Sequence, residues 1–234
     1  MDNPNITLLE AEFKDDNYVD IPNLEKQLNL TTKQLIYLPI KRLLDIIFSL
    51  IGLIVLSPLF IIVAIIIKLD SPGPIFFKQK RVGKDGKLFT MYKFRSMVVN
   101  AEAQLDELRE FNEMDGPVFK IARDPRVTKS GRWIRRTAID ELPQLFNVLT
   151  GQMTIVGPRP CLPSEFVHYK PWQKQRVLVK QGLTCYWQVR RSNTIKSFDT
   201  WMRYDNEYIQ KMGFMTDMLL ILKTVKVVMR LMGV

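Results

Sequence analysis

Two adjacent carboxylates, Asp140 and Glu141, are the residues of this sequence best suited to chemistry. Pro143 follows them, and proline is well tolerated only in the first turn of a helix, so we expect Asp140 near a helix N-cap. The free amides and the dipole of a helix N-terminus attract anions. The pattern therefore predicts an acceptor carboxylate beside a phosphate site, although such an acidic pair is also common capping.

Basic side chains in or beside predicted turns and strands can converge on this pair: Lys93, Arg95, Arg135, Arg136 and Arg159. An excess of cations over carboxylates suits a phosphorylated substrate. Two carboxylates without a histidine cluster suit an oxygen-liganded divalent ion such as Mg²⁺. His168 is the only histidine, and Cys161 and Cys185 have neither zinc-ligand spacing nor a disulfide framework, so their thiols suit a reducing cytoplasm.

The net charge of +10 is unevenly distributed, because residues 1–40 hold seven acidic and three basic side chains and the remainder carries about +14. A cationic body suits nucleic acid, anionic lipid or a phosphorylated substrate. Nucleic-acid binding needs exposed stacking aromatics among the basic residues, and Tyr92 and Phe94 around Lys93 barely meet this requirement. We expect no nucleic-acid partner.

A long apolar run from Leu43 to Ile67 indicates a membrane segment. As one straight helix it would reach about 37 Å, enough to cross a hydrocarbon core of about 30 Å. Pro58, preceded by Ser57, should break the helix because it lacks an amide hydrogen and clashes with the carbonyl of Ile54. The two limbs, roughly 22 Å and 15 Å long, are each too short to cross alone.

Basic residues flank both ends of this run: Lys41 and Arg42 before it, then Lys68, Lys78, Lys80 and Arg81 after it. The positive-inside rule therefore puts both ends in the cytoplasm and favours a re-entrant helix-break-helix. The alternative is one spanning helix with a tolerated proline kink.

We divide the chain into a polar N-terminal extension (1–40), the re-entrant membrane helix (41–69) and a cytoplasmic-face catalytic domain (70–234). The fold class is α+β and mainly helical. We expect a short helix near 24–37, a β-hairpin from 75–82 and 87–94, and an acidic helix at 101–113. Further helices are expected at 142–149 and 215–232, the last either interfacial or packed on the core. Residues 157–160 should form a rigid loop.

From about Lys41 to its C-terminus, the chain resembles the bacterial sugar transferases, also called polyprenyl-phosphate hexose-1-phosphate transferases or small monotopic phosphoglycosyl transferases. The matching stretches, in order, are Lys41-Arg42-Leu43-Leu44-Asp45, Ser57-Pro58, Ser71-Pro72-Gly73-Pro74, Tyr92-Lys93-Phe94-Arg95-Ser96-Met97, Asp140-Glu141-Leu142-Pro143-Gln144 and Gly157-Pro158-Arg159-Pro160. Six ordered matches over most of the chain are far more specific than one motif.

The resemblance implies transfer of a sugar-1-phosphate from a UDP-sugar to undecaprenyl phosphate, with release of UMP. It assigns Asp140 as the nucleophile that forms a covalent phosphosugar intermediate, and Glu141 to the Mg²⁺ ion, with Asp140 also near that ion. Lys93, Arg135 and Arg159 are the first candidates for the phosphates. The implied location is the cytoplasmic face of the bacterial inner membrane, with glycosyltransferases that extend the glycan as further partners.

One stretch departs from the family pattern. After Trp187-Gln188-Val189 the sequence lacks an expected glycine, so either Arg190 or Arg191 supplies a phosphate contact, with Arg191 favoured. Residues 1–40 contain no hydrophobic span, which suggests the short form of the family. An inactive membrane scaffold that binds polyprenyl phosphate or partner glycosyltransferases is the alternative function. No motif identifies the sugar.

Overall fold

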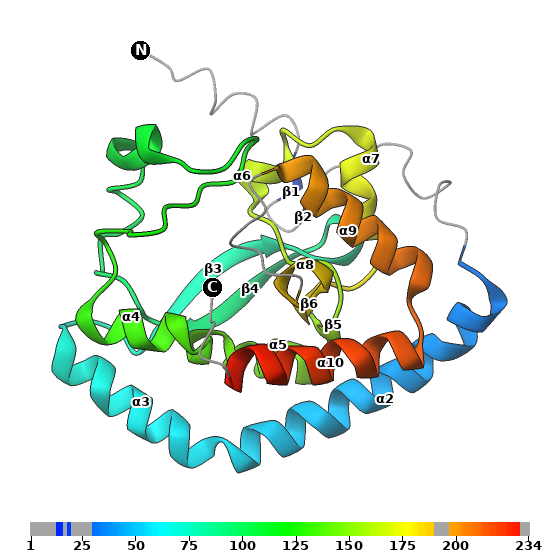
Figure 1. Ribbon diagram of the computed structural model, residues 1–234, viewed down its shortest axis with the longest axis horizontal. Helices are drawn as coiled ribbons and strands as arrows, with labels where there is room; N and C mark the ends of the chain where they lie inside the picture. Colours follow the sequence, from blue (N-terminus) through cyan, green and yellow to red (C-terminus); the bar gives the residue numbers. More distant parts are fainter. Residues whose placement is uncertain (1–12, 16–17, 20–29, 190–196, 230–234) are drawn as a thin grey trace.

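The computed structural model describes residues 13–15, 18–19, 30–189 and 197–229. Two helices, α2 (Thr32–Val55) and α3 (Ser57–Asp70), form a bent arm along one edge of the molecule, and the other described elements lie above this arm (Figure 1). The described part is mainly helical with three two-stranded sheets. The α+β class is confirmed.

Helix α2 begins inside the segment that we expected to be a polar extension. Thr31 caps it: the Thr31 hydroxyl accepts from the Gln34 amide, and the Gln34 side chain accepts from the Thr31 amide. Residues 32–37 of the short helix expected near 24–37 therefore belong to the same helix as the first limb of the membrane segment, and residues 24–29 lie outside the described residues. At 1.5 Å per residue the limbs are about 36 Å and about 21 Å long, which corrects the shorter predicted lengths.

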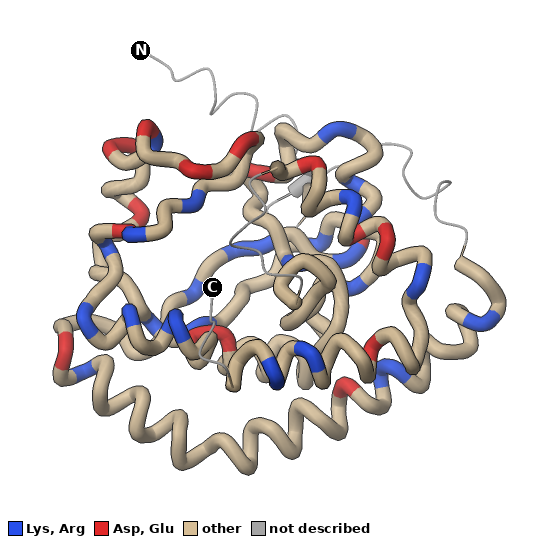
Figure 2. Tube along the Cα trace, viewed as in Figure 1, with Lys and Arg blue, Asp and Glu red and all other residues tan. Residues whose placement is uncertain are grey.

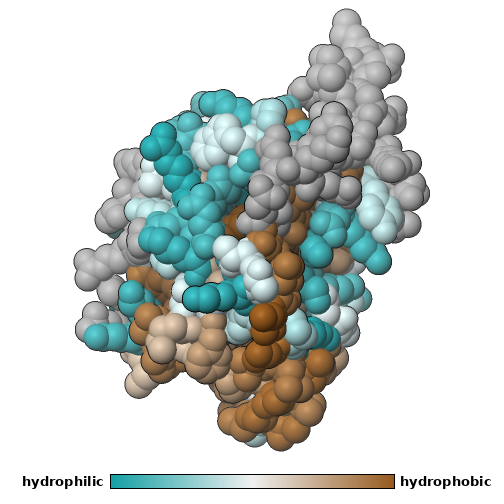
Figure 3. All heavy atoms as spheres, turned by 90° about the vertical axis from the view of Figure 1, so that its right-hand side faces the viewer, coloured by the Kyte–Doolittle hydropathy of each residue, from teal (hydrophilic) through white to brown (hydrophobic). Residues whose placement is uncertain are grey.

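The polar and apolar faces of α2 are inverted relative to a helix on a soluble core. The side chains that it buries against the protein are largely polar or charged: Gln34, Tyr37, Lys41, Asp45 and Ser49. Its outward face exposes large apolar side chains, among them Leu43, Ile51 and Ile54. The apolar surface along this edge is visible in Figure 3.

The helix breaks at Leu56, as predicted, and Ser57 and Pro58 start α3. The two axes differ by 59°. The Ser57 hydroxyl donates to the Ile54 carbonyl at 2.8 Å, so the carbonyl that Pro58 cannot serve still has a partner. Among the described helices none passes alone as a membrane span, whereas α2 and α3 pass together as a bent pair.

The predicted hairpin is present as β3 (Phe76–Val82) and β4 (Leu88–Phe94), which pair antiparallel across the short 3-10 turn η2 (Lys84–Gly86). Its turn residue Asp85 has a φ of 55°. Asn147 fixes helix α5 (Gln144–Leu149) to β4: its side chain donates to Thr90 O at 2.7 Å and accepts from Tyr92 N at 3.1 Å.

Two elements differ from expectation in the middle of the chain. The acidic segment 101–113 is a series of turns followed by the 3-10 helix η3 (Asp106–Phe111), not one α-helix. Strands β5 (Thr154–Val156) and β6 (Gly182–Thr184) form a parallel pair that the sequence pattern did not reveal. Strands β1 (Phe13–Asp15) and β2 (Tyr18–Val19) form the third pair.

Short helices connect these parts. They are α4 (Lys129–Arg136), η4 (Ile139–Glu141), α6 (Pro163–Phe166), α7 (Pro171–Lys174), η5 (Gln175–Leu178) and α8 (Tyr186–Val189). Figure 2 shows that the charged residues concentrate above the arm, while most of α2 and α3 carries none. The main hydrophobic core includes the aromatic side chains of Phe166, Trp187 and Trp201.

Helix α9 (Phe198–Lys211) leads into α10 (Phe214–Met229), which runs beside α2 (Figure 1). One face of α10 packs on the core through Asp217 and Leu220. The Asp217 carboxylate accepts from Tyr37 and Tyr208 and pairs with Lys41. The opposite face exposes apolar side chains such as Met215, Leu219 and Leu222, so the helix contacts the core on one side and presents an apolar surface on the other.

Candidate active site

The acidic pair lies in the 3-10 turn η4, between α4 and α5. Ala138, at the start of this turn, adopts a left-handed conformation with φ 55°. The N-cap of α5 is Pro143, so Asp140 lies near a helix N-cap as predicted, but in the turn that precedes the helix. The turn packs against β4, which brings Lys93 to the pair.

Glu141 is held by two cations. Lys93 Nζ lies 2.7 Å and Arg159 Nη2 3.0 Å from the same carboxylate oxygen, Oε1. The other oxygen, Oε2, accepts from Gln188 Nε2 at 3.4 Å. Burial alone would raise the pKa of Glu141, but Arg159 and Lys93 outweigh burial and lower it to about 2. Glu141 is therefore an ionised residue fixed in place.

Asp140 differs from its neighbour. Its side chain is buried, with 9% of the residue exposed, and within the described residues its carboxylate makes no hydrogen bond or ion pair. Burial raises the pKa of Asp140 to about 6, against the opposing effect of Lys93. The site therefore combines one fixed carboxylate with one whose oxygen atoms are uncommitted.

Arg159 comes from the predicted rigid loop, with Pro158 and Pro160 on either side of it. Its guanidinium lies 5.6 Å from the Trp187 ring centroid. Trp187 in turn stacks on Trp201 at 4.4 Å with an interplanar angle of 8°. The sequence did not predict that Trp187 contacts Arg159 or that Gln188 contacts Glu141. Both residues belong to the Trp187-Gln188-Val189 stretch that precedes Arg190 and Arg191.

A cavity of about 950 Å³ opens beside the pair. Basic side chains dominate its wall: Arg81, Lys120, Arg123, Arg132, Arg135, Arg136 and Arg159, against the acidic Glu113, Asp124 and Glu165. Phe119, Trp187 and Trp201 add aromatic surface. A cationic, partly aromatic cavity of this size can take a large anionic ligand with a ring system.

The structure separates the predicted basic residues into two groups. Lys93 and Arg159 contact the pair, and Arg135 and Arg136 line the cavity next to it. Arg95 corrects the prediction, because its guanidinium is buried and donates to the Ser71 hydroxyl and to the carbonyls of Ser71, Pro72 and Pro74. It fixes the turn after α3. Arg190 and Arg191 lie outside the described residues.

The carboxylates of Asp140 and Glu141 are a limited set of metal ligands. Within the described ranges, no cluster of three or more His, Cys, Asp or Glu side chains is arranged to hold a metal ion. Mg²⁺ in phosphate-handling sites commonly takes one or two carboxylates and completes its shell with substrate phosphates and water. The pair fits that use, and it does not form a site made of protein ligands alone.

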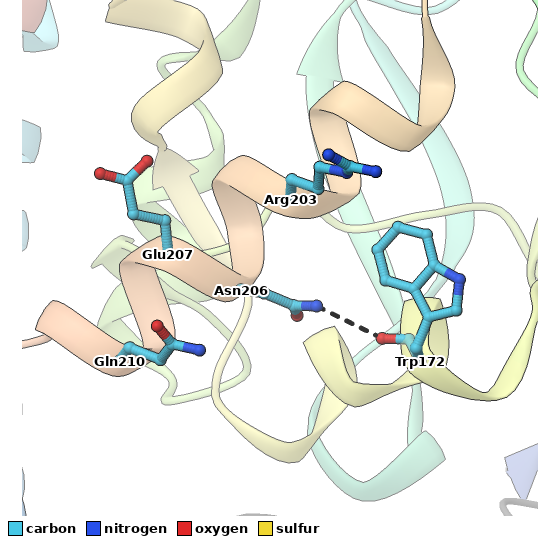
Figure 4. Close-up of a pocket in the computed structure, with 5 residues that line it drawn as sticks. All are labelled: Trp172, Arg203, Asn206, Glu207 and Gln210. Carbon is cyan, nitrogen blue, oxygen red and sulfur yellow. Dashed lines mark hydrogen bonds between the residues drawn. The ribbon is translucent and has the colours of Figure 1, made fainter.

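A second depression, of about 420 Å³, lies on α9 and is lined by Trp172, Arg203, Asn206, Glu207 and Gln210 (Figure 4). Asn206 Nδ2 donates to the Trp172 carbonyl at 3.4 Å across it. None of the predicted site residues lines this depression. Three of them, Arg135, Arg136 and Arg159, line the large cavity instead.

Comparison with known proteins agrees with the resemblance. The family model described as bacterial sugar transferase matches residues 36–231. The chain belongs to this family. Bacterial sugar transferases similar to it include the galactosyl transferase CpsE of Streptococcus agalactiae, which is 44% identical over 189 residues, covering 81% of this chain and 42% of that protein.

Two further relatives differ in how much of their own length this chain covers. The undecaprenyl-phosphate galactose phosphotransferase of Salmonella typhimurium is 42% identical over 198 residues, or 82% of this chain and 40% of that protein. The exopolysaccharide production protein ExoY of Sinorhizobium fredii is 35% identical over 192 residues, or 80% of this chain and 84% of that protein. The chain thus spans about two fifths of the length of the first two relatives and most of the third.

Proposed function

We propose that this chain transfers a sugar-1-phosphate from a UDP-sugar to undecaprenyl phosphate and releases UMP. The observation that carries the proposal is the Asp140–Glu141 pair, in which Asp140 is buried and Glu141 is paired with Lys93 and Arg159, at the edge of a cationic cavity. The names of relatives that act on undecaprenyl phosphate, such as the Salmonella typhimurium galactose phosphotransferase, support the acceptor.

Asp140 is the proposed nucleophile, because its carboxylate is uncommitted among the described residues. In the first step, an Asp140 oxygen attacks the phosphorus that carries the sugar. The bond from this phosphorus to the oxygen that bridges the two phosphates breaks, and UMP leaves with the electron pair. The products are UMP and an aspartyl-phosphosugar intermediate.

In the second step, a phosphate oxygen of undecaprenyl phosphate attacks the same phosphorus. The bond between this phosphorus and Asp140 breaks, which regenerates the carboxylate and yields undecaprenyl diphosphate sugar. Arg159 and Lys93 favour both steps, because their charges offset negative charge where an anionic carboxylate meets a phosphate.

We propose Mg²⁺ as the cofactor, held by Glu141 and Asp140 together with the substrate diphosphate. Bound there, it would neutralise phosphate charge and improve UMP as a leaving group. Glu141 is kept ionised and oriented by Lys93 and Arg159, as a ligand of a divalent ion requires.

The proposed location is the cytoplasmic face of the bacterial inner membrane. The outward apolar faces of α2 and α3, the break at Leu56 and the basic residues at both ends support a re-entrant arm. A polyprenyl phosphate presents its phosphate at headgroup depth, so an enzyme seated on that plane need not extract its acceptor. Glycosyltransferases that extend the glycan are proposed further partners.

The test is release of UMP by the detergent-purified chain from a panel of UDP-sugars, with Mg²⁺ or with EDTA, and with or without undecaprenyl phosphate. We expect Mg²⁺-dependent release from one donor that rises with the lipid acceptor. Absence of release across the panel, from protein shown to be folded, would contradict the proposal and favour an inactive scaffold that binds polyprenyl phosphate or partner glycosyltransferases.

A further inference from the structure

A smaller cavity, of about 310 Å³, lies between α2 and the loops around β5 and η5. It shares no lining residue with the large cavity beside Asp140. Its wall combines apolar side chains, including Leu38, Leu178 and Met212, with the charged side chains of α2 and two lysines from elsewhere, Lys84 and Lys180. The proposed transfer reaction does not use this cavity.

Two of its charged groups already have partners inside the protein. Lys41 pairs with Asp217, and its Nζ also donates to the Val156 carbonyl at 2.9 Å. Asp45 accepts from the Thr154 hydroxyl at 2.7 Å and from the Ile155 amide at 2.9 Å. These neutral donors fix the Asp45 carboxylate but leave its charge, so the wall carries one negative charge against a larger number of positive charges.

Those positive charges belong to Arg42, Lys84 and Lys180. The Arg42 guanidinium is fixed, because it donates to the Val148 carbonyl at 2.7 Å and to the Leu149 carbonyl at 2.8 Å. Lys180 makes no hydrogen bond or ion pair within the part of the chain that the structure describes. Lys84 is half exposed and pairs only loosely with Asp85, at 3.6 Å.

Arg42 and Lys180 converge at Gly151. Measured from the position that a β-carbon on Gly151 would occupy, Arg42 Nη2 lies at 3.2 Å and Lys180 Nζ at 3.7 Å. Burial lowers the pKa of Lys180, and the charges of Arg42 and Lys84 lower it further, whereas the charge of Asp45 opposes this shift. Two cationic groups that approach one point can both interact with an external anion.

The helix that carries Arg42 also carries the outward apolar face. Leu38 and Pro39 line the cavity and are exposed, and Leu43, next to Arg42, is exposed toward the proposed membrane side. A cationic point with apolar walls at the edge of this face fits a ligand with a phosphate head and a hydrocarbon tail.

We propose that this cavity binds an anionic phospholipid of the bilayer, with the headgroup phosphate between Arg42 and Lys180 and with Lys84 at the rim. The inference rests on the proposed placement of α2 at the membrane surface and is independent of the transfer reaction. The bound lipid would fix the first limb of the arm against α5 through Arg42.

Lipid retention by the full chain tests the site. The protein is purified in detergent, mixed with phosphatidylglycerol or phosphatidylcholine, and the bound lipid is counted by native mass spectrometry. The test variant is Lys84→Gln/Lys180→Gln. Its matched control is Lys223→Gln/Lys226→Gln, which removes two exposed lysines from α10 beside the same apolar surface. Thermal unfolding of each variant verifies that it is folded.

We expect the wild-type chain to retain phosphatidylglycerol in preference to phosphatidylcholine, and the test variant to bind it about tenfold more weakly while the control does not. Equal losses in both variants would show general electrostatic attraction and overturn the site. Displacement of the lipid by an excess of inorganic phosphate would show a free-anion site and overturn the lipid assignment.

The UMP-release assay separates this inference from the proposed function. A chain that retains phosphatidylglycerol at this site but releases no UMP from any donor would contradict the transfer reaction alone. A chain that releases UMP but retains both lipids equally would contradict the lipid site alone.

Discussion

Asp140 and Glu141 are neighbours in the chain, yet their side chains have opposite surroundings. Glu141 takes the hydrogen bonds of Lys93 and Arg159, whereas Asp140 is buried beside these charges without a bond to any described residue. Glu141 is a poorer candidate for the attacking group, because Lys93 and Arg159 hold one of its oxygen atoms and stabilise its negative charge. We therefore propose different roles for the two carboxylates, because Lys93 and Arg159 bind Glu141 and leave Asp140 unpaired among the described residues.

Replacement of the proposed nucleophile gives the first prediction. Asp140→Asn should lower UMP release by about a thousandfold or more, because the amide is a poor nucleophile. The Asp140 carboxylate makes no hydrogen bond or ion pair with described residues, so the thermal unfolding midpoint should stay close to that of the wild type. Substantial UMP release by the folded variant would contradict the assignment of Asp140.

A second prediction concerns the ion pair. Glu141→Gln should destabilise the chain by about 2–3 kcal/mol, because it leaves Lys93, whose side chain is only 14% exposed, without its counter-charge. The double variant Lys93→Met/Glu141→Gln should recover part of this stability, because the buried Lys93 charge is removed while Arg159 still lacks its carboxylate partner, but should stay inactive. The measurements are chemical denaturation in detergent and UMP release. Equal stability of the single and double variants would show that Lys93 does not need Glu141.

Sequence patterns located the acidic pair but not every basic residue around it. Lys93 and Arg159 reach Glu141 as expected, while Arg95, two residues after Lys93, instead fixes the Ser71–Pro74 turn. Lys93 and Arg95 lie two residues apart on one strand-like stretch, so the sequence pattern treats them alike. They differ because the turn after α3 packs against Arg95 and takes its hydrogen bonds, whereas Lys93 reaches Glu141. Chemical type alone could not separate their roles.

Two prolines have different effects on helix α2: the helix continues through the first and ends just before the second. Pro39 lies inside α2, whereas Pro58 follows the break at Leu56. The second site differs because Ser57 offers its hydroxyl to the Ile54 carbonyl at 2.8 Å and so stabilises the bent form. Proline therefore permits the bend, and its neighbour supports it.

This difference leads to a prediction about topology. Pro58→Ala should favour a straight continuation of α2 into α3 and push the segment towards a spanning form, because the clash with Ile54 O disappears. Cysteines introduced at Lys33 and Lys78 can report the two flanks with an impermeant thiol reagent. The native Cys161 and Cys185 are buried and free, so they give a low background. If both flanks of Pro58→Ala remained on one side, Pro58 would not be required for re-entry.

The buried polar face of α2 predicts that its contacts with Asp217 stabilise the fold. Asp217 joins Lys41 and Tyr37 of α2 to Tyr208 of α9, across gaps of more than 170 residues to α2. Asp217→Ala should cost about 3–4 kcal/mol of unfolding free energy, because Lys41 would be buried without a partner. Asp217→Asn, which keeps hydrogen-bonding atoms, should cost less. Denaturant titration in detergent compares the two variants, and equal losses would argue against a role for the charge.

The elements that sequence analysis recovered are those with a local signal. The hairpin has alternating strands around a turn, and the helix break has Ser57-Pro58. The β5–β6 pair was missed, because three-residue strands 25 or more positions apart carry no periodicity that could reveal them. The start of α2 at Thr32 was missed because its polar side chains suggested solvent, whereas they are buried against distant residues.

The whole molecule separates charge from apolar surface. Charged side chains gather above the arm, and the outward faces of α2, α3 and α10 carry exposed apolar side chains such as Ile51, Ile62 and Leu222 (Figures 2 and 3). Apolar surface of this extent, contributed by three helices, is costly in water and typical of a membrane-facing surface. From the sequence, α10 could be either an interfacial helix or a helix packed on the core. In the structure one face of α10 packs on the core and the other exposes apolar side chains.

We predict that the apolar face of α10 lies in the membrane at a depth similar to that of α2. An environment-sensitive fluorophore on Leu222→Cys should be quenched by lipid-borne quenchers in vesicles about as strongly as one on Ile51→Cys of α2, since both side chains are exposed on the apolar side. A fluorophore on Glu107→Cys, in the exposed acidic 3-10 helix remote from α2 in Figure 1, should respond only to water-soluble quenchers. If the Leu222 probe behaved like the Glu107 probe while Ile51 remained in lipid, α10 would lie above the membrane surface, and the arm of α2 and α3 would hold the enzyme there without it.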